Sequence, residues 1–126
     1  MIEINNLSRS SLDLTLLRKT VELVLKEEDV KGNISIAIIE KEEMRTLNKQ
    51  CRGKDRATDV LSFSYMDGEE LGEIVICPEA VTLGIYRILI HGVLHVIGYK
   101  HSLEMEEKQE NYLSLLDSKI FNRIKK

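Results

Sequence analysis

Residues 88–101 read Ile-Leu-Ile-His-Gly-Val-Leu-His-Val-Ile-Gly-Tyr-Lys-His and contain every histidine of the chain. His91 and His95 are four positions apart, so on a helix they lie one turn apart on the same face. The apolar residues around them predict a largely buried helix. Gly98 is the residue type that commonly ends a helix in a left-handed turn, which lets His101 fold back towards the first two histidines.

The three histidines indicate a metal centre, because three converging imidazoles with a fourth position open are the ligand set of a catalytic zinc site. A single histidine on an apolar face is more often a core residue, but three with this spacing favour a metal. We therefore predict one Zn²⁺ per chain on His91, His95 and His101, carried by a zincin-like helix. The spacing is also that of the metzincin peptidases, whose general base is a glutamate directly after the first histidine. That position is Gly92 here, which disfavours a peptidase.

The rest of the chain alternates strand and helix patterns in the order βαβαββαα. Two runs, 59–65 and 71–77, flank the turn residues Asp67-Gly68 and predict a hairpin. The whole pattern predicts an α+β fold, in which a small mixed four-stranded sheet is packed with about four helices. The other predicted strands are at 1–6 and at 34–39, the second of them central. Two helices are predicted before the hairpin, one capped by Ser10 or Ser11 and one at 40–50. Two more follow it, one at about 79–97 with Pro78 in its first turn and Gly84 and Gly92 inside it, and one from a Ser102 cap to about 121.

The composition, with 43% hydrophobic and 31% charged residues, is that of a single globular domain over residues 1–126. No signal peptide is visible, and no apolar run approaches the ~20 residues that span a bilayer, so we expect no membrane partner. Cys51 and Cys77 lack CxxC spacing, and we interpret them as reduced thiols. These features together predict a cytoplasmic protein.

Basic residues are concentrated at the end of the second predicted helix and in the loop after it. The net charge of −3 argues against general affinity for nucleic acids, but residues 45–56 hold five cations and one acid. Such a patch suits a substrate that carries phosphate, although charge alone favours a solvated helix end. Arg52 is the best candidate to bind phosphate, since its planar guanidinium stays protonated and matches phosphate oxygens. The other cations are Arg45, Lys49, Lys54 and Arg56.

Three motifs of the chain resemble those of the YbeY endoribonuclease family, in the family's order and over about residues 1–120. The first comprises Leu47-Asn48, Arg52-Gly-Lys-Asp and Thr58-Asp-Val-Leu-Ser-Phe63. The second is Leu71-Gly-Glu-Ile-Val-Ile76. The third is His91-Gly-x-Leu-His95-x-x-Gly98-Tyr99-x-His101.

The resemblance implies a metal-dependent, single-strand-specific endoribonuclease that acts in the maturation of small-subunit (16S) ribosomal RNA and in ribosome quality control. It implies zinc on His91, His95 and His101 and a functional arginine at Arg52. RNA would enter along the basic residues Arg45, Lys49, Lys54 and Arg56, mostly through its phosphates. The expected partners are single-stranded or ribosomal RNA and the small ribosomal subunit, with neither DNA nor a membrane.

The chain departs from the family pattern at several positions. Lys100 stands where the family usually has aspartate, next to the last histidine, and would weaken metal binding or meet RNA phosphate. Ala57 and Ser64 stand where prolines are common. The segment 77–90 is shorter than is typical, which predicts a different cleft wall.

Two other functions stay open at this point. One is a ribosome-assembly protein that binds RNA and whose metal is mainly structural. Lys100 favours that hypothesis, and the open fourth metal position argues against it. The other is a metzincin-like peptidase.

Four further residues each allow two interpretations. Thr58 and Asp59 line the site, or they form a turn or cap before the next strand. Glu73 serves the site as a general base or by contacting a metal ligand, or it lies at the surface. Tyr99 stacks on a base, or it packs beside Gly98.

Overall fold

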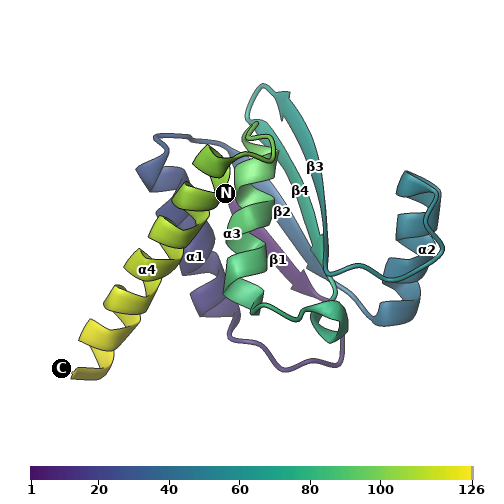
Figure 1. Cartoon of the computed structure of the whole chain (residues 1–126), viewed down its shortest axis with the longest axis horizontal. Coiled ribbons are helices and arrows are strands. Elements are labelled where there is room, and N and C mark those ends of the chain that lie inside the picture. Colours follow the sequence, from purple (N-terminus) through teal and green to yellow (C-terminus); the bar gives the residue numbers. More distant parts are fainter. Residues whose placement is uncertain (126) are drawn as a thin grey trace.

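The computed structural model describes the chain from Met1 to Lys125, with side chains described as far as Lys119. Its elements follow the order expected from the sequence, with one short 3₁₀ turn added (Figure 1). In chain order they are β1 (Ile2–Asn6), α1 (Leu14–Glu27), β2 (Asn33–Ile38), α2 (Lys41–Arg52), β3 (Val60–Asp67), β4 (Glu70–Ile76), η1 (Pro78–Ala80), α3 (Ile85–Val96) and α4 (Leu103–Lys125). None of the helices described is long and apolar enough to cross a membrane.

The four strands form one mixed sheet in the order β1-β2-β4-β3. β1 and β4 both run parallel to β2, and β3 runs antiparallel to β4. The predicted hairpin is therefore confirmed, and so are the mixed sheet and the central position of β2. Ile34, Ile36 and Ile38 of β2 share one face of the sheet, and all three are buried.

Helices α1, α3 and α4 pack against one another on one face of the sheet (Figure 1). The larger core lies between these helices and the sheet, where Leu17, Ile36 and Leu89 are almost completely buried. A smaller core joins α2 to the sheet through Met44 and Leu61. In Figure 1, α2 stands apart from the other three helices, to the right of the β3–β4 hairpin.

The helix that carries the first two histidines is shorter than predicted. The expected start at about Glu79 is wrong, because Pro78 opens only a single 3₁₀ turn. Gly84, expected inside the helix, precedes α3 with a φ of 97°, a conformation that glycine adopts without strain. Gly92 does lie inside α3. A Cβ there would stand 3.1 Å from the Ile74 side chain, so glycine lets α3 approach the sheet closely.

One predicted helix cap is wrong and another is confirmed. Asp13, not Ser10 or Ser11, caps α1, since its carboxylate accepts the backbone N–H three residues further on at 3.0 Å. Ser102 caps α4 as predicted, because its Oγ accepts the backbone N–H of Met105 at 3.1 Å. The backbone of α4 continues a few residues past the expected end.

Candidate metal centre

Three histidines gather beside the C-terminal half of α3. His91 and His95 lie one turn apart on that helix. Gly98, with a φ of 110°, reverses the chain, and His101 returns to the same place just before α4. The nitrogen atoms that the rings offer lie within 4.8 Å of one another, and the Nε2 atoms of His91 and His95 are 3.1 Å apart. The structure thus brings the three rings together, as their spacing predicts.

A hydrogen bond on one side of the His95 ring leaves its Nε2 facing the other histidines. Its Nδ1 lies 2.9 Å from the backbone carbonyl oxygen of Tyr99. A carbonyl oxygen only accepts, so Nδ1 carries a proton, and in the neutral ring the lone pair is then on Nε2. Burial lowers the pKa of His95, and the charges of His91, His101 and Arg52 lower it further, although the hydrogen bond to Tyr99 acts in the opposite direction.

His91 is held from the neighbouring helix. Its Nδ1 lies 2.8 Å from Oε1 of Gln109, a partly buried residue of α4. As in His95, an oxygen atom outside the centre contacts Nδ1, while Nε2 faces the other histidines. Sequence reasoning missed Gln109, because the contact joins two helices and leaves no periodic signal in either.

The donor set fits a divalent transition metal such as zinc. Imidazole nitrogen binds zinc at about 2.0–2.1 Å, and two such ligands on a tetrahedral ion lie roughly 3.3–3.4 Å apart. The 3.1 Å between the Nε2 atoms of His91 and His95 is close to that separation. Three protein ligands leave one further position on a tetrahedral ion, which is typical of catalytic sites.

The histidines line a cavity of about 590 Å³, and Arg52 lines it with them. α2 extends past its predicted end, so Arg52 lies in the last turn of a helix and not in a loop. Gly53 then ends α2 with a φ of 69°, the left-handed conformation common at helix ends. The remaining residues of the cavity come from the segment before β3 and from β3 itself: Thr58, Asp59, Val60, Ser62 and Ser64.

Thr58 and Asp59 combine both interpretations given for them. They line the cavity, and Asp59 also caps the start of β3 by accepting the N–H of Val60 at 2.8 Å. The hydroxyl of Ser64 donates to the carbonyl oxygen of Val96 at 2.6 Å. This bond ties β3 to the end of α3, close to the histidines.

A nearly buried carboxylate holds the loop between α3 and α4. Glu28, directly after α1, has 8% of its side chain exposed. It accepts hydrogen bonds from Tyr99 at 2.6 Å, from Lys108 at 3.1 Å and from Tyr112. Burial raises the pKa of Glu28, but these hydrogen bonds outweigh it, so the pKa lies below its ordinary value. Tyr99 is therefore a packed side chain, and Glu28 is a second supporting residue that the sequence did not indicate.

Glu73 and Lys100 lie outside the cavity lining. Glu73 is exposed on β4, whereas the next residue, Ile74, packs beneath α3. Successive strand residues face opposite sides of a sheet, so Glu73 lies on the side away from α3, and its surface interpretation is confirmed. Lys100 is exposed beside His101.

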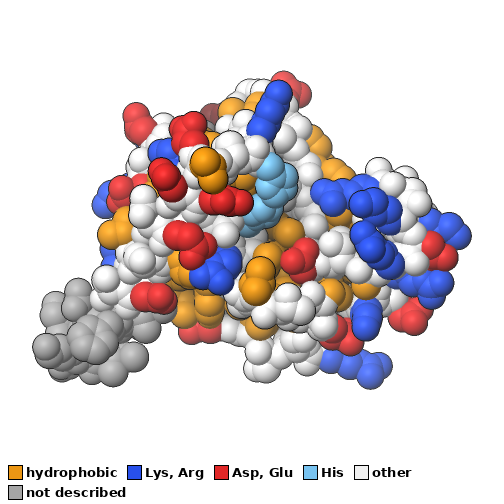
Figure 2. Space-filling view, viewed as in Figure 1, with side chains coloured by type: hydrophobic (Ala, Val, Ile, Leu, Met, Phe, Trp, Pro, Cys, Tyr) orange, Lys and Arg blue, Asp and Glu red, His pale blue; other side chains and the backbone are white. Residues whose placement is uncertain are grey.

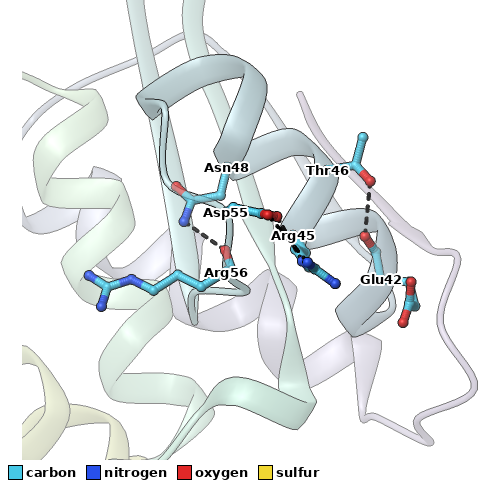
Figure 3. Close-up of polar contacts among 6 residues, drawn as sticks. All are labelled: Glu42, Arg45, Thr46, Asn48, Asp55 and Arg56. Carbon is cyan, nitrogen blue, oxygen red and sulfur yellow. Dashed lines mark hydrogen bonds and ion pairs between the residues drawn. The ribbon is translucent and has the colours of Figure 1, made fainter.

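The predicted basic residues divide into two groups. Arg45 forms a two-pronged ion pair with Asp55, at 2.8 and 3.3 Å, and this hydrogen bonding lowers the pKa of the Asp55 carboxyl. Buried Asn48 donates to the backbone carbonyl oxygen of Arg56 at 2.8 Å, and Figure 3 shows the Arg56 side chain extending away from the Arg45–Asp55 pair. Among the side chains described, four of the five cations form no ion pair: Lys49, Arg52, Lys54 and Arg56.

The surface around the histidines has opposite charges on its two sides. Figure 2 shows the histidines between acidic side chains over α4 and basic side chains over α2. Glu104 and Glu106 in the first turn of α4 belong to the acidic side. A polyanion would be attracted towards α2 and repelled from α4.

The fold and the site together define the class of protein: an α+β protein with a solvent-accessible three-histidine centre suited to a divalent metal. A family model described as Endoribonuclease YbeY matches residues 3–125. The Endoribonuclease YbeY of Thermotoga maritima is 34% identical over 90% of this chain and 87% of its own, and that of Carboxydothermus hydrogenoformans is 37% identical over 92% and 97%. A solution structure of a Thermotoga maritima protein aligns with a TM-score of 0.68 at 30% identity, covering 98% of this chain and 93% of that chain. The present chain therefore belongs to the YbeY endoribonuclease family, as its motifs predict.

The lowered pKa of His95 predicts that the metal-free protein loses stability as the pH falls through the ordinary histidine value of 6.5. The unfolded chain binds this proton near 6.5, whereas the folded chain binds it only at a lower pH. The unfolded state thus holds more protons in that window, and the free energy of unfolding rises with pH there. Urea unfolding followed by circular dichroism, with a chelator present and over about pH 5 to 8, measures the effect. The same slope in His95→Ala as in the wild type would contradict this assignment.

Proposed function

We propose that this chain is a zinc-dependent endoribonuclease that hydrolyses single-stranded RNA, acting in maturation of 16S ribosomal RNA and in ribosome quality control. The observation that carries the proposal is the presence of Arg52 in the same cavity as His91, His95 and His101. We expect residues 1–126 to act as one domain whose partners are ribosomal RNA and the small ribosomal subunit. The activity is expected in the cytoplasm, where this RNA is found.

The three histidines would hold one Zn²⁺. When bound, the ion supplies a Lewis acid that makes hydroxide available near neutral pH. The chain's own part is to present Nε2 of His91 and His95 without a proton. For His95 the Tyr99 carbonyl does this, because it accepts a hydrogen bond from Nδ1–H. The donor set and these outer contacts support a zinc centre.

Arg52 would stabilise the transition state at the phosphate that is cleaved. Hydrolysis of a phosphodiester adds water across a P–O bond, and negative charge builds up on the phosphate oxygens in the transition state. A guanidinium donates parallel hydrogen bonds to two such oxygens and does not lose its proton at any working pH. Since Arg52 lies in the last turn of α2, its backbone is already in place before the substrate binds.

The charge distribution supports RNA binding along α2. Lys49, Lys54 and Arg56 are exposed cations on the α2 side of the cavity and form no ion pair among the side chains described. They would contact phosphates, which gives salt-sensitive binding with little sequence preference. The restriction to single strands and the choice of ribosomal RNA rest on the family relationship.

Arg52→Ala is expected to lower the rate of RNA cleavage by about 10²–10³-fold while RNA binding changes little, because the guanidinium acts mainly on charge that develops in the transition state. Single-turnover cleavage of a labelled single-stranded RNA, together with a filter-binding assay, measures both quantities. Lys19→Ala, which removes an exposed cation from α1, serves as the control. Equal cleavage by Arg52→Ala and the wild type would rule out this role for Arg52.

The Arg45–Asp55 ion pair predicts that Arg45 contributes less to RNA binding than Arg56. Arg56→Gln is expected to reduce the slope of log K against log salt by about one, as for the loss of one phosphate contact. Arg45→Gln removes a cation whose charge Asp55 already balances, and a smaller change is expected. RNA affinity measured at several salt concentrations gives both slopes, and a larger effect of Arg45→Gln would contradict the division.

Two alternatives have their own signatures. RNA binding without any cleavage by the zinc-loaded wild type would favour an assembly protein with a structural metal. Casein cleavage that a chelator abolishes would favour a peptidase, which the glycine at position 92 disfavours.

A further inference from the structure

The contact between His91 and Gln109 indicates which nitrogen of the His91 ring carries the proton. Oε1 of Gln109 lies 2.8 Å from His91 Nδ1, and Nε2 of the same amide lies 3.3 Å from a carboxylate oxygen of Glu110. A carboxylate only accepts, so the NH₂ group of Gln109 must be on the Glu110 side. The amide oxygen then faces the imidazole, and His91 must donate from Nδ1.

Glu110 is itself held in place by the helix that carries His91. Arg87, one turn before His91 on α3, donates to both of its carboxylate oxygens, at 2.8 and 3.1 Å. The contacts therefore close a ring between the helices, from Arg87 to Glu110, to Gln109 and back to His91. Each member is restrained by a partner on the other helix or by its neighbour in the chain.

We infer that Gln109 is a positioning residue of the metal centre, which holds His91 with its proton on Nδ1 and its Nε2 lone pair towards the metal. The inference rests on the three-histidine centre of the proposed function. Without an acceptor at Nδ1, the ring can rotate and can carry its proton on Nε2, where the proton blocks metal binding. Outer partners of this kind typically change metal affinity by about 10–100-fold.

His95 provides an internal reference for a test. Its Nδ1 donates to the Tyr99 backbone carbonyl, and no substitution at position 109 removes that acceptor. An effect that acts through Gln109 must therefore appear at His91 and leave the proton of His95 on Nδ1. General loosening of the fold would affect both rings.

The first measurement is the tautomer of each histidine in the metal-free protein, read from ¹⁵N chemical shifts in long-range ¹H–¹⁵N spectra. The wild type is expected to show His91 protonated on Nδ1. Gln109→Leu is expected to show a mixture of tautomers at His91 and no change at His95. Gln109→Glu keeps an acceptor oxygen and is expected to restore the wild-type tautomer.

The second measurement is the affinity for Zn²⁺, in competition with a chromophoric chelator. Gln109→Leu is expected to bind zinc about 10–100-fold more weakly than the wild type, and Gln109→Glu to recover most of that loss. Asn111→Leu changes an exposed amide on the same helix and is expected to bind zinc as the wild type does.

The inference would be overturned if Gln109→Leu bound zinc as tightly as the wild type and kept the wild-type tautomer at His91. That result would leave the metal centre itself intact. An equal loss of affinity in Asn111→Leu, or a loss with the His91 tautomer unchanged, would also overturn it. Failure of the wild type to bind zinc would instead count against the proposed function. The tautomers of the metal-free protein would then still decide whether Gln109 sets the ring of His91.

Discussion

The site depends on a simple property of the neutral imidazole ring, which has one nitrogen that donates and one that accepts. For accepting nitrogens from different rings to meet at one point, the donating nitrogens must be satisfied elsewhere. The Tyr99 carbonyl satisfies His95, and Gln109 satisfies His91. One of these acceptors lies in the turn after α3 and the other on α4, so the centre requires the helix, the turn and the neighbouring helix together.

The larger core explains why these parts stay together. α3 lies between α1, α4 and the sheet, and it approaches the sheet closely because position 92 is glycine. Glu28 then joins the end of α1 to the turn after α3 and to α4 through Tyr99, Lys108 and Tyr112. The histidines therefore lie on a well-packed frame. By contrast, α2 and the loop after it, which carry Arg52 and the other cations, pack on a separate small core. The three histidines and Arg52 are thus supported by different parts of the molecule.

Local sequence patterns predicted the features that depend on residues close together in the chain, namely the helices, the strands, the hairpin turn and one helix cap. Alternating apolar residues located the strands, and apolar residues three and four positions apart located the helices. The Asp67-Gly68 turn indicated the hairpin, and Ser102 indicated a cap. The predicted start of α3 was wrong because proline fits the first turn of a 3₁₀ helix as well as that of an α-helix. The positive φ of Gly84 then separates this short 3₁₀ helix from α3. The histidine cluster was predictable because its spacing is short.

The supporting contacts could not be predicted, because they join residues far apart in the chain. Gln109 meets His91 across two helices, and Glu28 meets Tyr99 across a separation of 71 positions. Neither residue stands out in composition or periodicity. The Arg45–Asp55 pair joins a helix to the loop after it, and it changes how the basic patch is interpreted, since one of its five cations is already balanced.

The most direct test of the account is the metal content of the untagged protein, measured by elemental mass spectrometry beside a His95→Ala variant. The account predicts about one zinc per chain in the wild type and its loss in the variant, with both proteins folded as judged by circular dichroism. A correctly folded wild type without metal, or a variant that retains it, would contradict the account and would mean that the three histidines serve only in packing.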